Sequence, residues 1–214
     1  MIITRILILF LSIFANFFYT QKIGIISDIN PQMGYVVFKG EFFNEKPILE
    51  KDVDYNFIKF IENHFQSKNI QTEQFYSNHF TDYKMFYESK SAILDLKKIC
   101  SENNFSKIIL VLKNTQYIDV NDPMLIYENL NHELGFETHK KTPTRALLYG
   151  NFKIYVYDFS SNKLNLIINK VYIVHRFKQP LFDKNSFDLQ NDEPQKKFSS
   201  ELEQRFIEKF DKIK

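Results

Sequence analysis

The sequence is short of the residues that mark several common classes of protein. Cys100 is its only cysteine, so no disulfide can form within the chain. Its 5 glycines lie apart from one another, which excludes a phosphate-binding loop and a dinucleotide-binding fingerprint. The formal net charge is +2 over 214 residues and the two signs are interspersed, so we expect no nucleic acid among the partners.

Apolar and aromatic side chains are plentiful instead, at 44% and 16% of the chain. That composition is typical of a folded globular protein and excludes a disordered tail or a multi-pass membrane protein. The chain is long enough to bury one sizeable core. Cys100 ends an apolar stripe of helical period, so we predict a buried thiol with a structural role.

Residues 1–20 contain a long apolar stretch. Arg5 precedes an apolar run from Ile6 to Phe14, which only Ser12 interrupts. A cation followed by about ten apolar residues is typical of a secretory signal, and is shorter than the roughly 20 residues that span a bilayer. We therefore predict an exported protein, periplasmic or extracellular at the cell envelope, with one α/β domain at residues 21–214. The alternative is an uncleaved anchor, which alone would tie the chain to a membrane.

Beyond residue 20, the spacing of apolar residues predicts alternating strands and helices. Phe57, Ile61 and Phe65 recur at helical spacing, with Asp52 or Asp54 available to cap that helix. The segment at 107–112 is apolar after its first residue, as expected of a strand covered on both faces. We expect strands at 22–26, 35–38, 70–75 and 107–112, helices at 54–68, 91–103 and 198–213, and a hairpin of 152–158 with 164–177.

The order helix–strand–helix–strand over residues 54–112 indicates βαβ crossovers. We therefore predict an α/β fold, with α+β as the alternative: a mixed sheet with two crossover helices, a carboxy-terminal β-hairpin and a closing amphipathic helix. Asn169 and Lys170 interrupt the alternation of the hairpin and predict a β-bulge. Residues 113–149 are the least regular stretch, with a short helix expected through Leu134, and a loop of that length is usually functional.

The order of these expected elements, from Lys22 to Phe177, resembles that of the small α/β domains of exported assembly factors in bacterial envelopes. The similarity covers element order alone, and no sequence motif accompanies it. What the resemblance implies is an assembly role at the cell envelope.

A histidine-containing segment of the irregular stretch is the candidate for metal binding. A zinc-protease helix needs a second histidine four residues after His132, and that position is Phe136, so the motif is absent. His132, Glu137 and His139 still offer two imidazoles and a carboxylate, which suit zinc. The alternative is a polar loop whose histidines face water.

Aromatic side chains gather between Phe75 and Tyr87, interleaved with polar residues. Tyr76, Tyr83 and Tyr87 are predicted to form a contact surface for an unknown protein or glycan. The alternative is that the phenylalanines of this segment fold back onto the core.

These patterns favour an exported, non-catalytic domain with a binding or envelope-assembly role. The sequence has no Gly-x-Ser-x-Gly elbow, so we assign no catalytic residue and expect no cofactor. The competing hypothesis is an exported metal-dependent hydrolase whose site lies in the loop at 113–149.

Overall fold

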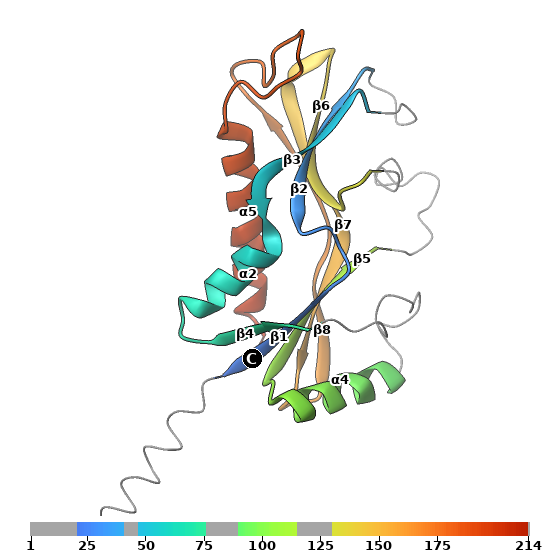
Figure 1. Cartoon of the computed structure of the whole chain (residues 1–214), viewed down its shortest axis with the longest axis vertical. Helices are drawn as coiled ribbons and strands as arrows, with labels where there is room; N and C mark the ends of the chain where they lie inside the picture. Colours follow the sequence, from blue (N-terminus) through green and yellow to red (C-terminus); the bar gives the residue numbers. More distant parts are fainter. Residues whose placement is uncertain (1–20, 41–46, 76–89, 115–129, 214) are drawn as a thin grey trace, which may run out of the picture.

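The computed structural model describes residues 21–40, 47–75, 90–114 and 130–213 (Figure 1). The apolar start of the chain at 1–20 lies outside these ranges, and so do Tyr76, Tyr83 and Tyr87. The signal segment and the aromatic surface therefore stay predictions. Within the described ranges, no helix has both the length and the apolar character needed to cross a membrane.

Eight strands and three helices make up the described part of the chain. In chain order they are β1 (Lys22–Ser27), β2 (Gln32–Phe38), β3 (Leu49–Asn56), α2 (Phe57–Gln66), β4 (Gln71–Gln74), α4 (Lys90–Asn103), β5 (Lys107–Lys113), β6 (Leu134–His139), β7 (Thr142–Asp158), β8 (Lys163–Arg176) and α5 (Glu193–Phe210). The strands form one mixed sheet, and the carboxy-terminal hairpin and closing helix predicted from the sequence are both present.

β7 is the central strand of the sheet and is 17 residues long. β8 runs along one edge of β7, whereas the other edge pairs first with β6 and then with β5. β6 leads outward to β2 and β3, and β5 leads to β1 and β4. The 8-stranded sheet therefore divides into two halves, which the β7–β8 hairpin joins (Figure 1).

The half that contains β1 has the crossover topology predicted from the sequence. β1 pairs in parallel with both β4 and β5. α2 comes before β4 in the chain, and α4 lies between β4 and β5. Each of the two helices thus belongs to a connection between parallel strands, which confirms the βαβ prediction.

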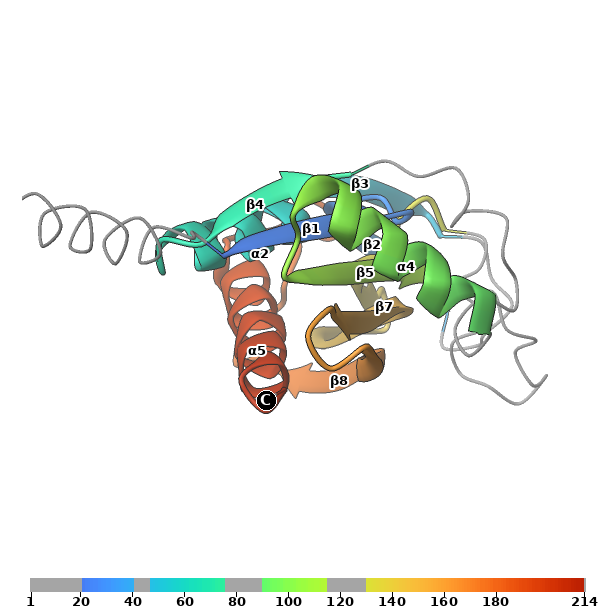
Figure 2. The same cartoon turned by 90° about the horizontal axis from the view of Figure 1, so that it is seen from below.

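The helices cover both faces of this half of the sheet. Alternate residues of β5 point to opposite faces, and Ile109 and Val111 pack in the cluster that α2 and α5 cover. Ile108 and Leu110 pack in the other cluster, with Leu96 of α4. Figure 2 shows α4 on the opposite side of β1 and β5 from α2 and α5. The face that packs against α2 and α5 is called the helical face below. The opposite face, on which α4 covers only the part at β1 and β5, is called the open face.

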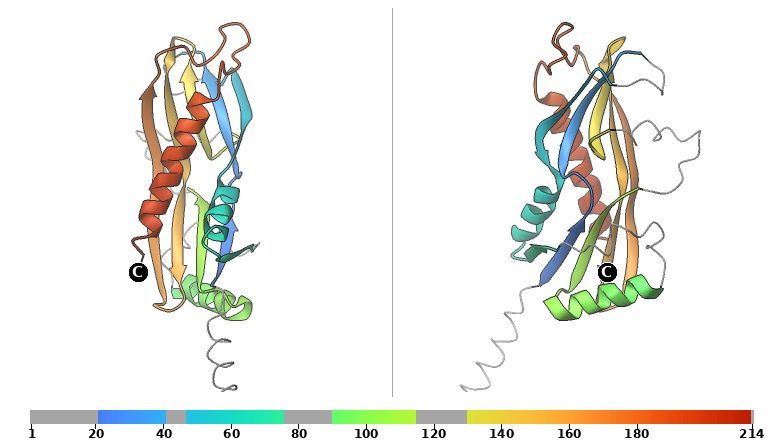
Figure 3. Two further views of the ribbon diagram at one scale, coloured as in Figure 1. Left: turned by 90° about the vertical axis from the view of Figure 1, so that its left-hand side faces the viewer. Right: turned by 45° about the vertical axis from the view of Figure 1, so that its right-hand side comes forward.

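Phenylalanines fill the core on the helical face. Phe206 of α5 contacts Phe57 and Phe65 of α2 edge-to-face, with ring centroids 6.0 and 6.4 Å apart. Phe57 in turn stacks on Phe152 of β7 at 5.8 Å. These contacts attach α5 to the sheet through α2, and Figure 3 shows α5 lying along the β7–β8 hairpin.

Cys100 lies in the smaller core cluster, as predicted. It is a free cysteine and is buried among the apolar side chains of α4 and β5. Burial raises the pKa of the thiol to about 12, and the negative charge of Asp158 acts in the same direction. The thiol is therefore a packing group and not a nucleophile.

The stretch at 113–149 was wrongly predicted where the structure describes it. No helix runs through Leu134, which instead begins β6, and β7 begins at Thr142. The prediction failed because Pro143 and Gly150 mark turns in most sequences. Here both lie inside β7, and Gly150 is at a register shift of the β7–β8 ladder, where a kink is tolerated.

Two smaller expectations are also corrected. β3 was not predicted, and the helix after it begins at Phe57 and not at 54. Its N-cap is Asn56, whose side chain accepts a hydrogen bond from Lys59 N, so neither Asp52 nor Asp54 caps it. A register shift lies at the predicted position, where Lys170 has a φ of 60°, but the extra residue is in β7, because Asn151 and Phe152 stand opposite Lys170.

We expect the Phe206→Ala substitution to lower the free energy of unfolding by about 3–5 kcal/mol. Phe206 is fully buried and joins both core helices, so truncation leaves a cavity that its neighbours cannot fill. Leu94→Ala is the control, because Leu94 of α4 is 64% exposed. Urea denaturation measures both, and a Phe206→Ala loss as small as the control would contradict this account of the core.

Candidate functional site

Polar side chains gather where the two halves of the sheet part. Asn151 of β7 links the two sides: its N–H donates to the Glu133 carbonyl at 2.7 Å, and its carbonyl accepts from Asn114 N at 3.0 Å. Glu133 stands just before β6, and Asn114 just after β5. The side chains of Glu133, Asn114 and Asn151 are buried, which is rare for such residues unless they have a defined role.

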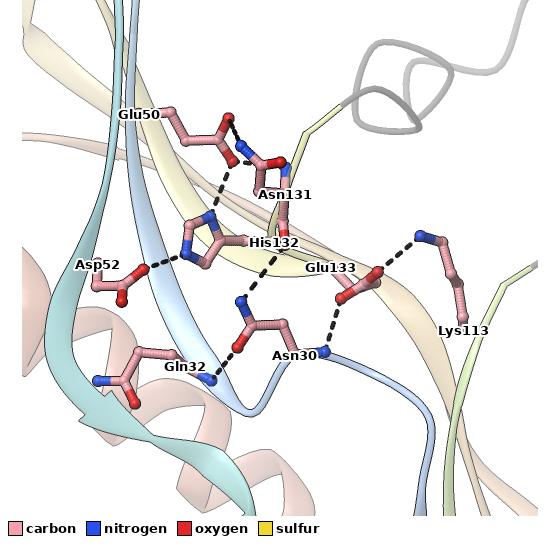
Figure 4. Close-up of polar contacts among 8 residues, drawn as sticks. All are labelled: Asn30, Gln32, Glu50, Asp52, Lys113, Asn131, His132 and Glu133. Carbon is pink, nitrogen blue, oxygen red and sulfur yellow. Dashed lines mark hydrogen bonds and ion pairs between the residues drawn. The ribbon is translucent and has the colours of Figure 1, made fainter.

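The segment before β6 provides a histidine held between two carboxylates (Figure 4). His132 Nδ1 lies 2.8 Å from Glu50 Oε1, and His132 Nε2 lies 2.6 Å from Asp52 Oδ1. Only 5% of the His132 side chain is exposed. Each ring nitrogen of His132 therefore has a carboxylate oxygen within hydrogen-bond distance, so the ring is held from both sides.

The residues of β2 and β3 around His132 leave space for its ring. Glu50 and Asp52 are two apart on β3, so their side chains project from the same face. On β2, Asp52 pairs with Gly34 and Glu50 pairs with Val36. A Cβ at Gly34 would lie 2.6 Å from His132 Cγ, so only glycine lets the imidazole pack against β2.

Glu50 is the most heavily bonded member of this group. Besides His132, it accepts hydrogen bonds from the backbone N and side-chain Nδ2 of Asn131, at 2.7 and 3.0 Å. Its side chain is 11% exposed, whereas that of Asp52 is 68% exposed. Glu50 therefore fixes the segment at 131–132 onto β3, and Asp52 closes the solvent side.

A second set of contacts continues from Glu133. Its carboxylate lies 2.7 Å from Lys113 Nζ and accepts a hydrogen bond from Asn30 N at 2.8 Å. Asp28 accepts from Lys113 N at 2.6 Å. Burial raises the pKa of Asp28, the Lys113 N–H opposes this, and the negative charge of Glu133 adds to the rise. Figure 4 shows Glu133, Lys113 and Asn30 next to the histidine set.

Together these contacts form a clamp, which we define as Asn30, Glu50, Asp52, Lys113, Asn131, His132 and Glu133. The clamp connects β3, the turn after β1, the end of β5 and the start of β6. Both ring nitrogens of His132 and both carboxylate oxygens of Glu133 have protein partners. These side chains thus cross-link the segments that carry them through charged hydrogen bonds.

The three residues predicted to bind a metal do not come together as one set. His139 Nε2 lies 3.3 Å from Glu137 Oε1, and His139 Nδ1 contacts the Gly40 carbonyl. His132 belongs to the clamp instead. Among the described residues, no group of three or more His, Cys, Asp or Glu side chains is arranged to hold a metal ion. The metal hypothesis stays a prediction.

Glu50 and Asp52 were missed as site residues because β3 was not predicted. The sequence did contain a signal for them. In Leu49–Asn56, the acids Glu50, Asp52 and Asp54 alternate with Lys51, Val53 and Tyr55, which is the period of a strand. Contact between that strand and His132, about 80 residues later, could not be inferred from spacing alone.

No protein-family model and no curated protein matches this chain. Among solved structures, the chain is similar to the hypothetical protein CT253 from Chlamydia trachomatis, with a TM-score of 0.38 and 10% sequence identity. The match covers 89% of this chain and 95% of that one. A likeness this weak carries no argument, so function must be inferred from the geometry of this molecule.

We expect Glu50→Gln to lower the free energy of unfolding by about 2 kcal/mol, because it weakens charge-assisted hydrogen bonds at a nearly buried site. Asp52→Asn is the matched control, since it changes the other carboxylate on the same histidine at an exposed position. Its loss should stay within about 0.5 kcal/mol. Equal losses in urea denaturation would show that Glu50 does not anchor the clamp.

The pair Glu137 and His139 predicts a pH dependence. The hydrogen bond to Glu137 raises the pKa of His139 above its ordinary value of 6.5, burial opposes the rise, and the Gly40 carbonyl adds to it. Protonated His139 therefore stabilises the folded state fully below pH 6.5, and that stabilisation is lost as the pH rises through the folded pKa.

NMR titration of the His139 ring protons measures this shift directly. In the Glu137→Gln variant, the midpoint should fall, because the carboxylate that favours the imidazolium is gone. The His175→Gln variant is the control, since His175 pairs with Glu201 on α5 and should leave the His139 midpoint unchanged. If the His139 midpoint is the same in the Glu137→Gln variant and in the native chain, Glu137 is not the group that raises the pKa of His139.

Proposed function

We propose that this chain is an exported, non-catalytic binding domain whose protein partner docks on β8. The observation that carries the proposal is a row of exposed apolar side chains on that strand: Leu166, Tyr172 and Val174 are 49%, 45% and 39% exposed. Large apolar side chains that gather on one strand favour an interaction surface over scattered surface residues.

The register shows that the row lies on a single face. Leu166 pairs with Tyr155 of β7, and Tyr172 and Val174 pair with Tyr149 and Leu147. These partners occupy alternate positions of β7, which face away from the side that α2 and α5 cover. Leu166, Tyr172 and Val174 therefore share the open face of the sheet.

Tyrosine suits such a surface, because its ring supplies contact area and its hydroxyl supplies a hydrogen bond. The exposed row therefore supports a protein partner. The predicted surface of Tyr76, Tyr83 and Tyr87 stays a separate prediction, since those residues lie outside the described ranges.

The clamp supports a non-catalytic role. Its histidine, carboxylates and lysine bond to one another and hold segments of the sheet together. The apolar run after Arg5 supports export, and an exported binding domain of this kind would act at the cell envelope.

The proposal is tested by placing the photo-reactive residue p-benzoylphenylalanine at Tyr172 in the native host. Irradiation should attach a discrete partner protein at this position. The same residue at Leu94 is the control, because Leu94 is an exposed apolar side chain of α4 and not of β8. If Tyr172 gives no adduct, or the same adducts as Leu94, β8 is not the docking surface.

A further inference from the structure

The backbone of β8 has an outer edge whose geometry can be worked out from one hydrogen bond. Phe177 N donates to Thr144 O at 2.7 Å, and Arg145 pairs with Arg176, so positions 144 and 177 face each other as a hydrogen-bonded pair. In an antiparallel ladder such pairs alternate with pairs whose N–H and C=O groups point away from the partner strand.

The alternation places three residues of β8 with their backbone groups outward. Arg176, Val174 and Tyr172 stand opposite Arg145, Leu147 and Tyr149, and all belong to the outward-pointing pairs. Among the described strands, β8 pairs with β7 alone. Figure 3 shows β8 at the outer margin of the sheet, with α5 lying against one face. Tyr172, Val174 and Arg176 thus offer unpaired N–H and C=O groups.

The residues of β8 itself carry positive charge and no acid, and Glu201 of α5 pairs with His175. β8 includes Lys163, Lys170 and Arg176 and has no Asp or Glu. Arg145 of β7 stands directly opposite Arg176, both side chains are exposed, and neither forms an ion pair within the described residues. Like charges opposite one another destabilise an antiparallel pair, so Arg176, which lies on the outer strand, gains from a carboxylate on a strand added beside it.

We propose that the edge of β8 from Tyr172 to Arg176 receives an extended acidic segment of the partner protein, which adds to the sheet as a further strand. This inference rests on the proposed function and specifies how its partner binds. Main-chain hydrogen bonds to Tyr172, Val174 and Arg176 give affinity, and side-chain contacts give specificity. The segment carries apolar side chains beside Tyr172 and Val174 and a carboxylate beside Arg176, where Arg145 of β7 adds to the positive charge.

The charge of β8 argues against a second copy of this chain as the occupant. Two β8 strands paired antiparallel would bring their lysines and arginines together with no acid on either strand to offset them. The bulge at Lys170 also limits the docking edge, because a residue at φ 60° interrupts the regular ladder. The regular part of the edge is the stretch at 171–176.

Val174→Pro tests strand addition without disturbing the β7–β8 ladder. Proline removes the outward N–H of Val174, and an edge strand tolerates proline where its N–H faces solvent. Val174→Thr is the matched control, since threonine is β-branched and keeps the N–H. The probe is an acetylated peptide Glu-Thr-Val-Thr-Val-Thr, and its control has lysine in place of glutamate.

The native chain and Val174→Thr should bind the glutamate peptide, and Val174→Pro should bind it at least about tenfold more weakly. The Arg145→Gln, Arg176→Gln double variant should lose a similar factor and lose the preference for glutamate over lysine. Thermal unfolding checks that each variant is folded. If Val174→Pro does not fold, the arginine variant decides, because it leaves the strand backbone unchanged.

Several outcomes overturn the inference. Equal binding of the glutamate peptide by Val174→Pro and the native chain would exclude strand addition, and equal binding of the lysine peptide would exclude the acidic partner. A concentration-dependent dimer that Val174→Pro abolishes would make the occupant a second copy. If the photo-reactive residue at Tyr172 still forms its adduct when Val174→Pro is also present, strand addition is excluded and the proposed function stands. If the photo-reactive residue at Tyr172 forms no adduct in the chain with native Val174, both the inference and the proposed function are excluded.

Discussion

The structure depends on β7 pairing with two different strands along one edge. β6 takes the first part of that edge and β5 takes the second, and Asn151 bonds to both sides at the junction. Everything else in the sheet attaches to β6 or β5, apart from β8, which spans both halves on the opposite edge. A sheet built in this way has a weak point where β5 and β6 part, since no ladder hydrogen bond joins them directly.

The clamp lies at that point, and this explains its chemistry. Asn30, Lys113 and Glu133 connect the turn after β1, the end of β5 and the start of β6. Polar and charged groups suit a place where backbone groups have no ladder partner, because each needs a hydrogen bond once it is buried. The buried histidine between Glu50 and Asp52 extends the link to β3. The polar site is thus a consequence of the topology.

The sequence predicted those elements whose pattern is local. The stripe of α2, the apolar run of β5 and the hairpin alternation all survive in the structure. β3 was not predicted because charged residues fill its exposed positions. β6 was not predicted because it lies within a stretch rich in turn-forming residues. The clamp could not be predicted, since His132 meets Glu50 only after β2 and β6 pair in parallel. The outward edge of β8 likewise requires the ladder register.

The position of β7 after β1–β6 in the chain has a consequence for how the protein is made. β1, β2 and β3 leave the ribosome first, yet β1 needs β5 and β2 needs β6, and both of these need β7. The sheet cannot close until β7 has been synthesised, so the part of the chain before β7 has no complete core to bury. A polypeptide with this topology keeps the apolar faces of its early strands incompletely covered until β7 is available to pair with β5 and β6.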